Sequence, residues 1–554
     1  MTQDSVESLL QKTRREAEER DAQRRSVKVG FPYINLALKA VETDAIQLIE
    51  ESKAKEAQAA CVEYKGNNVV FTAYDPKSEK AQAVIKELEA KGLKLKIFVV
   101  SLTSLQRAWD FYKYTVKKTA PLTGQMDIDK ERISALMKEL THLEKVRDGI
   151  LNFDFKKFST AQVLEIVLAG ALANRASDIH FEPSEETVKL RYRIDGDLRD
   201  VMSDLAKNIY TFMVSRIKLL SNLKINVRDE AQDGRFTVGL GTKEIELRVA
   251  IAPSEFGEVI VMRVLDPEAI GLTLAQLGLR KDDLEIIEAE LNRPNGLILN
   301  TGPTGSGKTT TLYAFLKHKQ SPDIKIITIE DPIEYHLAGI EQTQVKPKAN
   351  YTFANGLRSI MRQDPDVILI GEVRDKETAE IAIQAALTGH LVFSTVHANQ
   401  ASGAIPRFVD LGVKPTSIGP ALNLIIAQRL VKRLCVDCKV KEKITADLKK
   451  KLEKFVKDLP ERVAKKDFQD LEIYKPKGCA KCGGGFKGRI AIYELLRVSK
   501  EIESLMTKGA GEIEIQEFAL KQGMATMQQD GVLKVISGIT TFEEVEKITG
   551  KIEF

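Results

Sequence analysis

The sequence predicts an α/β fold built from several domains. Between residues 271 and 400, short apolar runs alternate with helix-prone stretches, as in a parallel sheet with crossover helices. One run, GLILN at 296–300, leads into GPTGSGKTT at 302–310. The spacing G-x-x-x-x-G-K-T between a strand and a helix matches the loop that holds phosphates in nucleotide hydrolases. The central part of the chain is therefore expected to be a P-loop core.

Length and composition limit the number of domains and the classes of protein to be considered. The chain has 554 residues, which at ordinary domain sizes predicts about three to five domains. Its 83 basic and 79 acidic side chains leave a net charge of only +4, which argues against a dedicated nucleic-acid binder. No apolar run approaches the ~20 residues that span a bilayer, and the first residues carry no apolar signal core. We therefore expect a cytoplasmic protein.

The N-terminal half is expected to hold two α/β domains. A polar tail over 1–25 precedes a small domain over 26–118, where the β-rich runs NNVVFTAYDP and LKIFVVSL flank a helical pattern. Residues 119–150 open with turn signals and continue as a charged helix, which predicts a linker. A second domain over 151–270 begins with the helix TAQVLEIVLAGALANR and continues with strand candidates such as VKLRYRID and EVIVMRVL.

The C-terminal half is expected to hold the ATPase core over 271–430. Its predicted strands are GLILN, KIITIE, VILIGEV and HLVFSTV. A cysteine-bearing subdomain with a charged insert follows over 431–495, and a helical subdomain over 496–554 ends the chain.

The phosphate loop predicts an ATP site with Mg²⁺. Its glycines let backbone N–H groups turn toward phosphate oxygens, and the following helix adds its positive N-terminal end. Lys308 is expected to reach the β- and γ-phosphates, and the Thr309 hydroxyl to ligate Mg²⁺. The residues predicted to hold the nucleotide are Gly302, Pro303, Thr304, Gly305, Ser306, Gly307, Lys308, Thr309 and Thr310.

Further polar residues follow the neighbouring predicted strands. DVILIGEVRD ends at Glu372, which is expected to hold Mg²⁺ through water. KIITIE runs into EDPIE, so Glu330 and Glu334 are both candidates to orient the attacking water. His390 and His397 stand at the two ends of TGHLVFSTVHAN. Either histidine alone would more often be a core residue, but beside three phosphate-site strands we expect a functional role.

Four elements in this order, GPTGSGKTT, TIEDPIEY, DPDVILIGEVRD and TGHLVFSTVHAN, resemble the secretion ATPase superfamily. The closer resemblance is to the branch that drives type II secretion and type IV pilus assembly. SDIHFEP, RYRIDGDLRD, QDGRF and RVAIAPSEFGEVIVMRVLD resemble that family's second N-terminal domain, and KQGMATMQQDGVLKVISGITTFEEV resembles its C-terminal part. The resemblance covers roughly 151–554 and is only loose over 26–118. It implies a RecA-like core preceded by a PAS-like domain.

The resemblance also implies roles for single residues. Glu334 matches the water-activating glutamate, with Glu330 as second choice. Glu372 matches the Walker B glutamate, and His397 matches the histidine that senses the nucleotide.

Two arginine pairs are implied in the same way. Arg248 and Arg263 in the second N-terminal domain match arginines that reach the phosphates, and Arg358 and Arg362 in GLRSIMRQD match a second pair. Phosphoryl transfer concentrates negative charge on the γ-phosphate oxygens, which an arginine can stabilise by ~10³–10⁵-fold in rate. If a flanking domain supplies the arginines, its closure would switch catalysis on. The alternative for each arginine is a surface ion pair.

Four of the five cysteines form two C-x-x-C pairs, Cys435/Cys438 and Cys479/Cys482, 40 residues apart. Four thiolates satisfy a structural Zn²⁺ and leave no open position for chemistry. Gly483 to Gly485 permit a tight turn after the last ligand. The alternative is four reduced structural thiols; nothing resembles a thioredoxin unit. The fifth, Cys61, is expected to be a buried apolar side chain.

The family resemblance links this tetracysteine element to assembly and secretion ATPases rather than to retraction ATPases. The charged insert between the two cysteine pairs is expected to be a solvated helical arm, with partner docking as the alternative.

The resemblance implies an ATP-hydrolysing homo-hexamer at the inner face of the cytoplasmic membrane. Its partner would be an inner-membrane platform protein, which passes motion to pilin-like subunits and provides the peripheral membrane association. We favour pilus assembly over type II secretion, although the ATPases of the two machines share every motif named above.

The hypothesis of a DNA-transfer motor of the same superfamily is weakened by the near-neutral charge and the single Trp. A non-hydrolysing scaffold is disfavoured by the intact Lys308, Glu334 and Glu372. No cyclic-di-GMP repeat is expected in residues 1–118.

Overall fold

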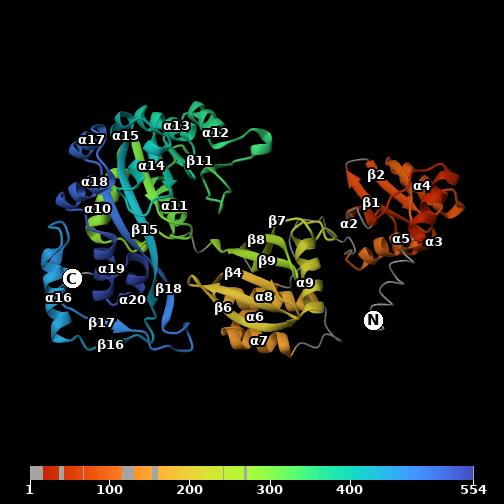
Figure 1. Cartoon of the computed structure of the whole chain (residues 1–554), viewed down its shortest axis with the longest axis horizontal. Helices are drawn as coiled ribbons and strands as arrows, with labels where there is room; N and C mark the ends of the chain where they lie inside the picture. Colours follow the sequence, from red (N-terminus) through yellow and green to blue (C-terminus); the bar gives the residue numbers. More distant parts are fainter. Residues whose placement is uncertain are drawn as a thin grey trace. The chain divides into compact units, whose positions relative to one another are not determined.

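The protein forms two compact units, Met1–Val264 and Leu265–Phe554 (Figure 1). A computed structural model describes residues 17–36, 41, 43–65, 68–114, 130–152, 160–240, 243–267, 271–552 and 554. Of the expected polar tail, residues 1–16 lie outside the described residues and 17–29 form a helix. Among the described helices, none is both long enough and apolar enough to cross a membrane.

A three-stranded sheet in the order β1-β2-β3 lies near the start of the first unit. β1 is antiparallel to β2, and β2 is parallel to β3, so helix α4 makes the crossover between β2 and β3. The strands are β1 (Ala59–Lys65), β2 (Asn68–Ala73) and β3 (Lys94–Val99). The helices are α2 (Thr43–Ile46), α3 (Glu51–Glu56), α4 (Glu79–Ala90) and α5 (Leu102–Trp109), followed by the 3₁₀ turn η1 (Asp110–Tyr114). Cys61 is fully buried in this core, as expected.

A six-stranded sheet in the order β6-β5-β4-β9-β8-β7 follows in the same unit. Buried and half-buried residues alternate along β5, so one face of the sheet carries the core. The strands are β4 (Ala176–Pro183), β5 (Thr187–Ile194), β6 (Asp197–Ala206), β7 (Gln232–Leu240), β8 (Lys243–Ser254) and β9 (Gly257–Leu265). Two helices, α8 (Thr160–Ala173) and α9 (Lys207–Leu220), contribute to the core.

The expected linker over 119–150 differs from the structure where it is described. Residues 119–129 lie outside the described residues. Beyond them the chain forms two helices, α6 (Lys130–Glu139) and α7 (Leu143–Leu151). Ile133 and Val146 are fully buried in the core of the six-stranded sheet domain. The sequence of these helices is charged, but each keeps an apolar stripe, and burial of that stripe fixes the helices on the domain.

The second unit is built on a seven-stranded sheet in the order β12-β11-β13-β14-β10-β15-β18. All registered pairs are parallel except β15 with β18. The strands are β10 (Gly296–Thr301), β11 (Ile326–Glu330), β12 (Glu341–Gln344), β13 (Val367–Ile370), β14 (Leu391–Val396), β15 (Leu422–Leu434) and β18 (Phe486–Arg497). The four strands predicted for the core are all present.

Helices cover both faces of this sheet, because its central strands are buried on both sides. One face packs against α10 (Lys281–Leu291) and α11 (Lys308–Lys319). The helices of the other face are α12 (Phe353–Ile360), α13 (Lys376–Leu387), α14 (Ala404–Asp410), α15 (Pro415–Ala421), α17 (Lys500–Thr507) and α18 (Glu512–Lys521).

Strands β15 and β18 were not anticipated. They form a long antiparallel hairpin that runs side by side in Figure 1 and adds two strands to the ATPase sheet. The boundary expected at residue 431 falls inside β15, and the boundary expected at 495 falls inside β18. The cysteine region is therefore an excursion from the end of this hairpin.

The charged insert differs from the solvated arm that we expected. Its helix α16 (Ala446–Asp458) buries Leu452 and Val456. They pack in one core with residues of α19 (Met527–Ile536) and α20 (Phe542–Thr549). A small sheet, β16 (Val440–Glu442) with β17 (Ile473–Lys475), closes the insert. The apolar side of α16 is thus covered by the C-terminal helices, and only its lysine-rich side faces solvent.

Candidate functional site

The predicted phosphate loop lies between β10 and α11, at the carboxyl edge of the parallel sheet. Gly305 and Gly307 have φ angles of 80° and 90°, which favour glycine, and Gly307 caps the N-terminus of α11. The Lys308 Nζ donates hydrogen bonds to the backbone oxygens of Gly302 and Pro303, at 2.7 and 3.0 Å. The lysine is therefore folded over the loop whose N–H groups would surround a phosphate.

Two features of the loop fit a nucleotide phosphate. The Ser306 hydroxyl is buried and has no hydrogen-bond partner among the described residues. Gly302 has a φ of 151°, and a Cβ atom built on it would lie 2.7 Å from that hydroxyl. A buried hydroxyl without a partner costs free energy unless a ligand or water satisfies it. Thr309, the predicted magnesium ligand, follows Lys308 in the first turn of α11.

Glu372 and His397 lie together at the same edge of the sheet. Glu372 follows β13, and His397 follows the adjacent strand β14. The Nε2 atom of His397 is 3.7 Å from Oε2 of Glu372, while Arg374 holds Oε1 at 2.5 Å. The Glu372 side chain is only 14% exposed. Because parallel strands bring their carboxyl ends to one edge, this pair and the phosphate loop belong to one site.

Glu330 is a core residue of this region. It is 4% exposed, and its carboxylate accepts hydrogen bonds from Tyr313, from Thr328 at 2.6 Å and from Gln342 at 3.1 Å. Burial raises the pKa of Glu330, with a smaller contribution from the charge of Glu334. Both carboxylate oxygens are therefore engaged by fixed protein donors.

Glu334 lies in the loop after β11 and is half-buried. This loop is held by Gln342 on β12, whose amide donates to the backbone oxygen of Tyr335 at 2.9 Å and accepts from the Leu337 N–H at 2.7 Å. Sequence reasoning missed Gln342, because nothing in its local pattern marks it as functional.

The predicted arginines fall in both units. Arg248 on β8 is 3.7 Å from Glu246, and Arg263 on β9 donates to the buried Asp178 at 3.1 Å. Both belong to the six-stranded sheet of the first unit.

The second arginine pair lies around α12. Arg358 forms a 2.5 Å ion pair with Glu377 on α13, and Arg362 lies in a 3₁₀ turn after α12. Within the described residues, no recorded hydrogen bond or ion pair joins Arg358 or Arg362 to the phosphate loop.

His390 does not belong to the site. It precedes β14, at the opposite end of the strand from His397. Its Nδ1 lies 3.0 Å from the backbone oxygen of Ala385 at the end of α13. The expectation that His390 acts at the phosphate site is therefore wrong, because residues at opposite ends of one strand cannot face the same edge of the sheet.

The four paired cysteines form the candidate metal centre. Cys435 and Cys438 follow β15, and Cys479 and Cys482 precede β18. Their sulfur atoms all lie within 4.8 Å of one another, with Cys438–Cys482 and Cys479–Cys482 distances of 3.7 Å. A tetrahedral site with Zn–S bonds of ~2.3 Å requires sulfurs about 3.8 Å apart.

The turn after the last cysteine is built as expected. Gly484 and Gly485 have φ angles of 69° and 95°. The Gly485 N–H points at the Cys482 sulfur, at 3.3 Å. Such donors to a thiolate support metal ligation, so the residues fit a structural metal ion.

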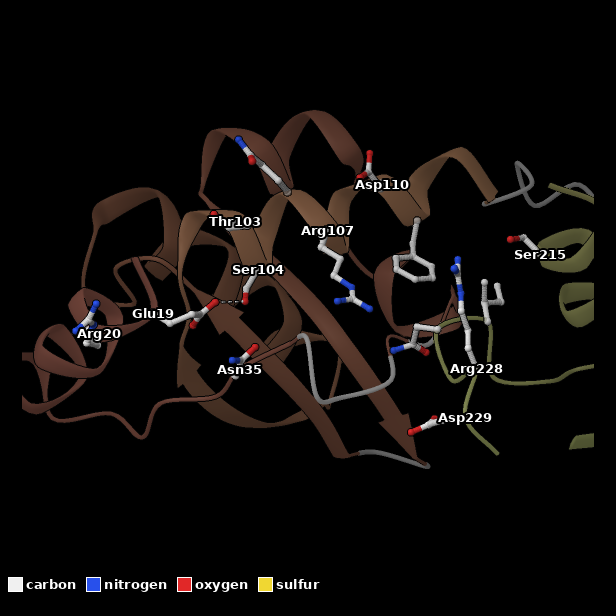
Figure 2. Close-up of a pocket in the computed structure, with 14 residues that line it drawn as sticks. Glu19, Arg20, Asn35, Thr103, Ser104, Arg107, Asp110, Ser215, Arg228 and Asp229 are labelled. Atoms are coloured by element: carbon white, nitrogen blue, oxygen red, sulfur yellow. Dashed lines mark hydrogen bonds between the residues drawn. The ribbon is translucent and has the colours of Figure 1, made fainter. Parts of the chain in front are cut away.

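The first unit also has an open cleft (Figure 2). Its charged lining is balanced: Glu19, Asp110 and Asp229 against Arg20, Arg107 and Arg228. The carboxylate of Glu19 accepts a hydrogen bond from the Ser104 hydroxyl at 2.9 Å, which Figure 2 marks with a dashed line. This balance gives the cleft no preference for an anionic ligand, and the chemistry is assigned to the phosphate loop.

The fold and the site define a P-loop ATPase. Residues 156–547 match the family model described as Type II/IV secretion system protein. The chain belongs to this family, as its motifs predicted.

Two curated relatives are named as ATPases, one of type IV pilus assembly and one of type II secretion. The Type IV pilus assembly ATPase PilB of Myxococcus xanthus is 36% identical over 523 residues, covering 94% of this chain and 89% of that protein. The Type II secretion system ATPase E of Vibrio cholerae is 42% identical over 439 residues, covering 79% and 84%. The fold is also that of the Legionella pneumophila ATPase DotB, with a TM-score of 0.51, 20% identity and coverage of 71% and 96%.

Proposed function

We propose that the protein is a hexameric motor that uses ATP hydrolysis to extend a type IV pilus. It would act from the cytoplasm on an inner-membrane platform protein, and through it on pilin-like subunits. The observation that carries this proposal is the match to the pilus assembly ATPase along 94% of the chain. The type II secretion relative is matched over 79%.

Within the site we propose that Glu334, and not Glu330, activates the attacking water. Glu330 is buried, and both of its oxygens accept hydrogen bonds from neighbouring side chains. A general base must reach the water that it deprotonates. Glu334 lies in the half-buried loop at the edge of the sheet.

Glu372 and Thr309 would hold Mg²⁺, and Lys308 the β- and γ-phosphates of ATP. The 3.7 Å separation of His397 from Glu372 supports a role for His397 in sensing the bound nucleotide. We further propose that Arg248, Arg263, Arg358 and Arg362 stabilise the charge that develops on the γ-phosphate.

The metal centre would hold Zn²⁺ as a structural ion. Its four ligands leave no open position, so we assign it no part in hydrolysis. The tetracysteine element supports extension rather than retraction.

Type II secretion remains the second candidate, supported by the 42% identity to the Vibrio cholerae ATPase. An experiment in the host cell distinguishes pilus extension from type II secretion. We would replace the gene with a Lys308→Ala copy, image surface pili by electron microscopy and compare exported proteins by mass spectrometry. Lost pili with normal export are expected for the pilus motor, whereas normal pili with missing exported proteins would assign the chain to secretion.

A Lys317→Ala copy provides the matched control. Lys317 is an exposed residue of the same helix α11, away from the phosphate loop. It should leave both pili and export unchanged, and immunoblots should show equal amounts of both variants. Normal pili together with normal export in the Lys308→Ala strain would contradict both functions.

A further inference from the structure

Two side chains of β15, Gln428 and Arg429, lie against the phosphate loop although they are more than 100 residues away in sequence. β15 runs parallel to β10 with Ala427 beside Thr301, so its next residues pass the loop that begins at Gly302. A Cβ atom on Gly302 would lie 2.6 Å from the backbone oxygen of Gln428 and 2.9 Å from Nη1 of Arg429. Only glycine permits this close approach of the two segments.

Gln428 joins the two ends of the loop. It is 2% exposed, and its Oε1 accepts hydrogen bonds from Asn300 on β10 and from Thr311 on α11, each at 2.9 Å. A Cβ atom on Gly307 would lie 2.8 Å from the Nε2 of Gln428. The loop therefore rests on this amide, which sets the spacing between the strand and the helix on either side of the phosphate cradle.

Arg429 joins the loop to the segment that carries His397. Its guanidinium donates to the backbone oxygens of Gln428 and Asn399, each at 3.0 Å. Asn399 follows His397 by two residues, and His397 faces Glu372. Burial lowers the pKa of Lys308, and the positive charge of Arg429 lowers it further.

We propose that Gln428 and Arg429 are positioning residues of the ATPase reaction with separable effects. Gln428 holds the phosphate cradle and thereby sets nucleotide affinity. Arg429 holds the His397 segment in place beside Glu372 and thereby sets the rate of turnover. The inference concerns hydrolysis itself and applies equally to a pilus motor and a secretion motor.

The test uses the full-length protein with Gln428→Leu, Arg429→Gln and Arg429→Lys. We would measure kcat and KM for ATP, the Kd of a fluorescent ADP analogue, and the melting temperature without nucleotide. Gln428→Leu should raise Kd and KM roughly 10-fold, with a smaller change in kcat. Arg429→Gln should lower kcat roughly 10- to 100-fold with Kd changed by less than about twofold. Arg429→Lys should recover part of this loss, because its ammonium can still reach one of the two carbonyls.

Arg433→Gln is the matched control, since Arg433 is exposed further along β15. This control variant should leave kcat, KM and Kd unchanged. A double-mutant cycle tests whether Arg429 acts through His397: in a His397→Ala background, Arg429→Gln should have a much smaller effect on kcat. Unchanged kinetics in the variants would overturn the proposal. So would kcat and KM that change in parallel with a lowered melting temperature, or an Arg429→Gln effect of equal size in both backgrounds.

Discussion

At the scale of single residues, Glu330 and Glu334 show how position in the fold gives two identical side chains different surroundings. Both stand in the motif EDPIE, and the sequence offered both as water-activating groups. Glu330 ends β11, where its carboxylate accepts hydrogen bonds from Tyr313 and Thr328 inside the core. Glu334 is carried beyond the strand into a half-buried loop. The end of the strand therefore fixes the Glu330 carboxylate inside the core, whereas Glu334 lies beyond the strand, in the loop.

We expect Glu334→Gln to lower kcat by at least ~10²-fold and to keep the affinity for ADP, because it removes a general base without removing phosphate contacts. Steady-state ATPase assays and titration with a fluorescent ADP analogue measure the two quantities.

Glu330→Gln is the comparison variant. Its amide nitrogen would replace one of the two accepting oxygens and face either the Tyr313 hydroxyl or the Gln342 amide, so we expect a loss of stability of about 1–3 kcal/mol and a smaller loss of kcat. Near-normal turnover of Glu334→Gln with an inactive but folded Glu330→Gln would reverse the assignment.

At the scale of elements, the β15–β18 hairpin links the nucleotide site to the cysteine centre. Gln428 and Arg429 lie at the loop, and Cys435 follows the end of the same strand. The cysteines close the far end of the hairpin, where Cys435 N–H donates to the Gly485 backbone oxygen at 2.9 Å.

The purified chain is expected to carry one equivalent of zinc, and Cys482→Ser to lose most of it, because three thiolates no longer complete the tetrahedron. Inductively coupled plasma mass spectrometry gives the metal content. Cys61→Ala is the control, since Cys61 is buried in the first unit, outside the metal cluster. Full zinc content in Cys482→Ser would rule out the four-cysteine site.

A buried ionic cluster joins three elements of the second unit. Asp530 on α19 is fully buried and accepts hydrogen bonds from Lys534, from Arg280 at 2.8 Å and from the Tyr493 N–H at 2.8 Å. Although burial acts to raise it, the charges of Lys534 and Arg280 hold the pKa of Asp530 below its usual value.

Asp530→Asn should destabilise the protein by about 3–5 kcal/mol, because it leaves the buried Lys534 without its counter-charge and removes one of the three carboxylates paired with Arg280. Asp447→Asn on α16 breaks an exposed ion pair with Lys451 and should cost less than about 1 kcal/mol. Urea unfolding of the full chain compares the two variants. Equal urea midpoints for the two variants would show that the buried cluster stabilises the fold no more than the exposed ion pair does.

At the scale of the whole molecule, the proposed catalytic groups are divided between two units. Arg248 and Arg263 belong to the six-stranded sheet, whereas the phosphate loop belongs to the seven-stranded sheet.

We expect Arg263→Ala to lower kcat by about 10³-fold while ADP still binds, since the arginine is proposed to act on the charge of the transition state. Asp178 keeps Arg193 as a partner at 3.5 Å, which limits the structural damage. Arg235→Ala, at an exposed position of β7, is the control and should retain activity.

Mixing Arg263→Ala with Lys308→Ala subunits tests the hexamer. Recovered activity in the mixture, with a hexamer seen by light scattering, is expected if subunits complete each other's sites. Wild-type turnover by Arg263→Ala alone would remove this arginine from the mechanism.

Much of the site could be read from the sequence because its signals are local. The spacing of Gly302, Gly307 and Lys308 encodes a backbone conformation within a few residues, and each C-x-x-C pair brings two sulfurs together by itself. Alternating apolar runs likewise predicted the four central strands, whose ends carry Glu372 and His397.

The remaining features depend on contacts between distant segments. The pairing of β15 with β10 brings Gln428 and Arg429 to the phosphate loop, yet no pattern around residue 428 marks that position. The burial of Glu330, and the packing of α16 against α19 and α20, likewise arise from neighbours far along the chain. Local spacing fixes backbone geometry and ligand chemistry, whereas side-chain surroundings are set by which elements pack together, and that becomes visible in the folded chain.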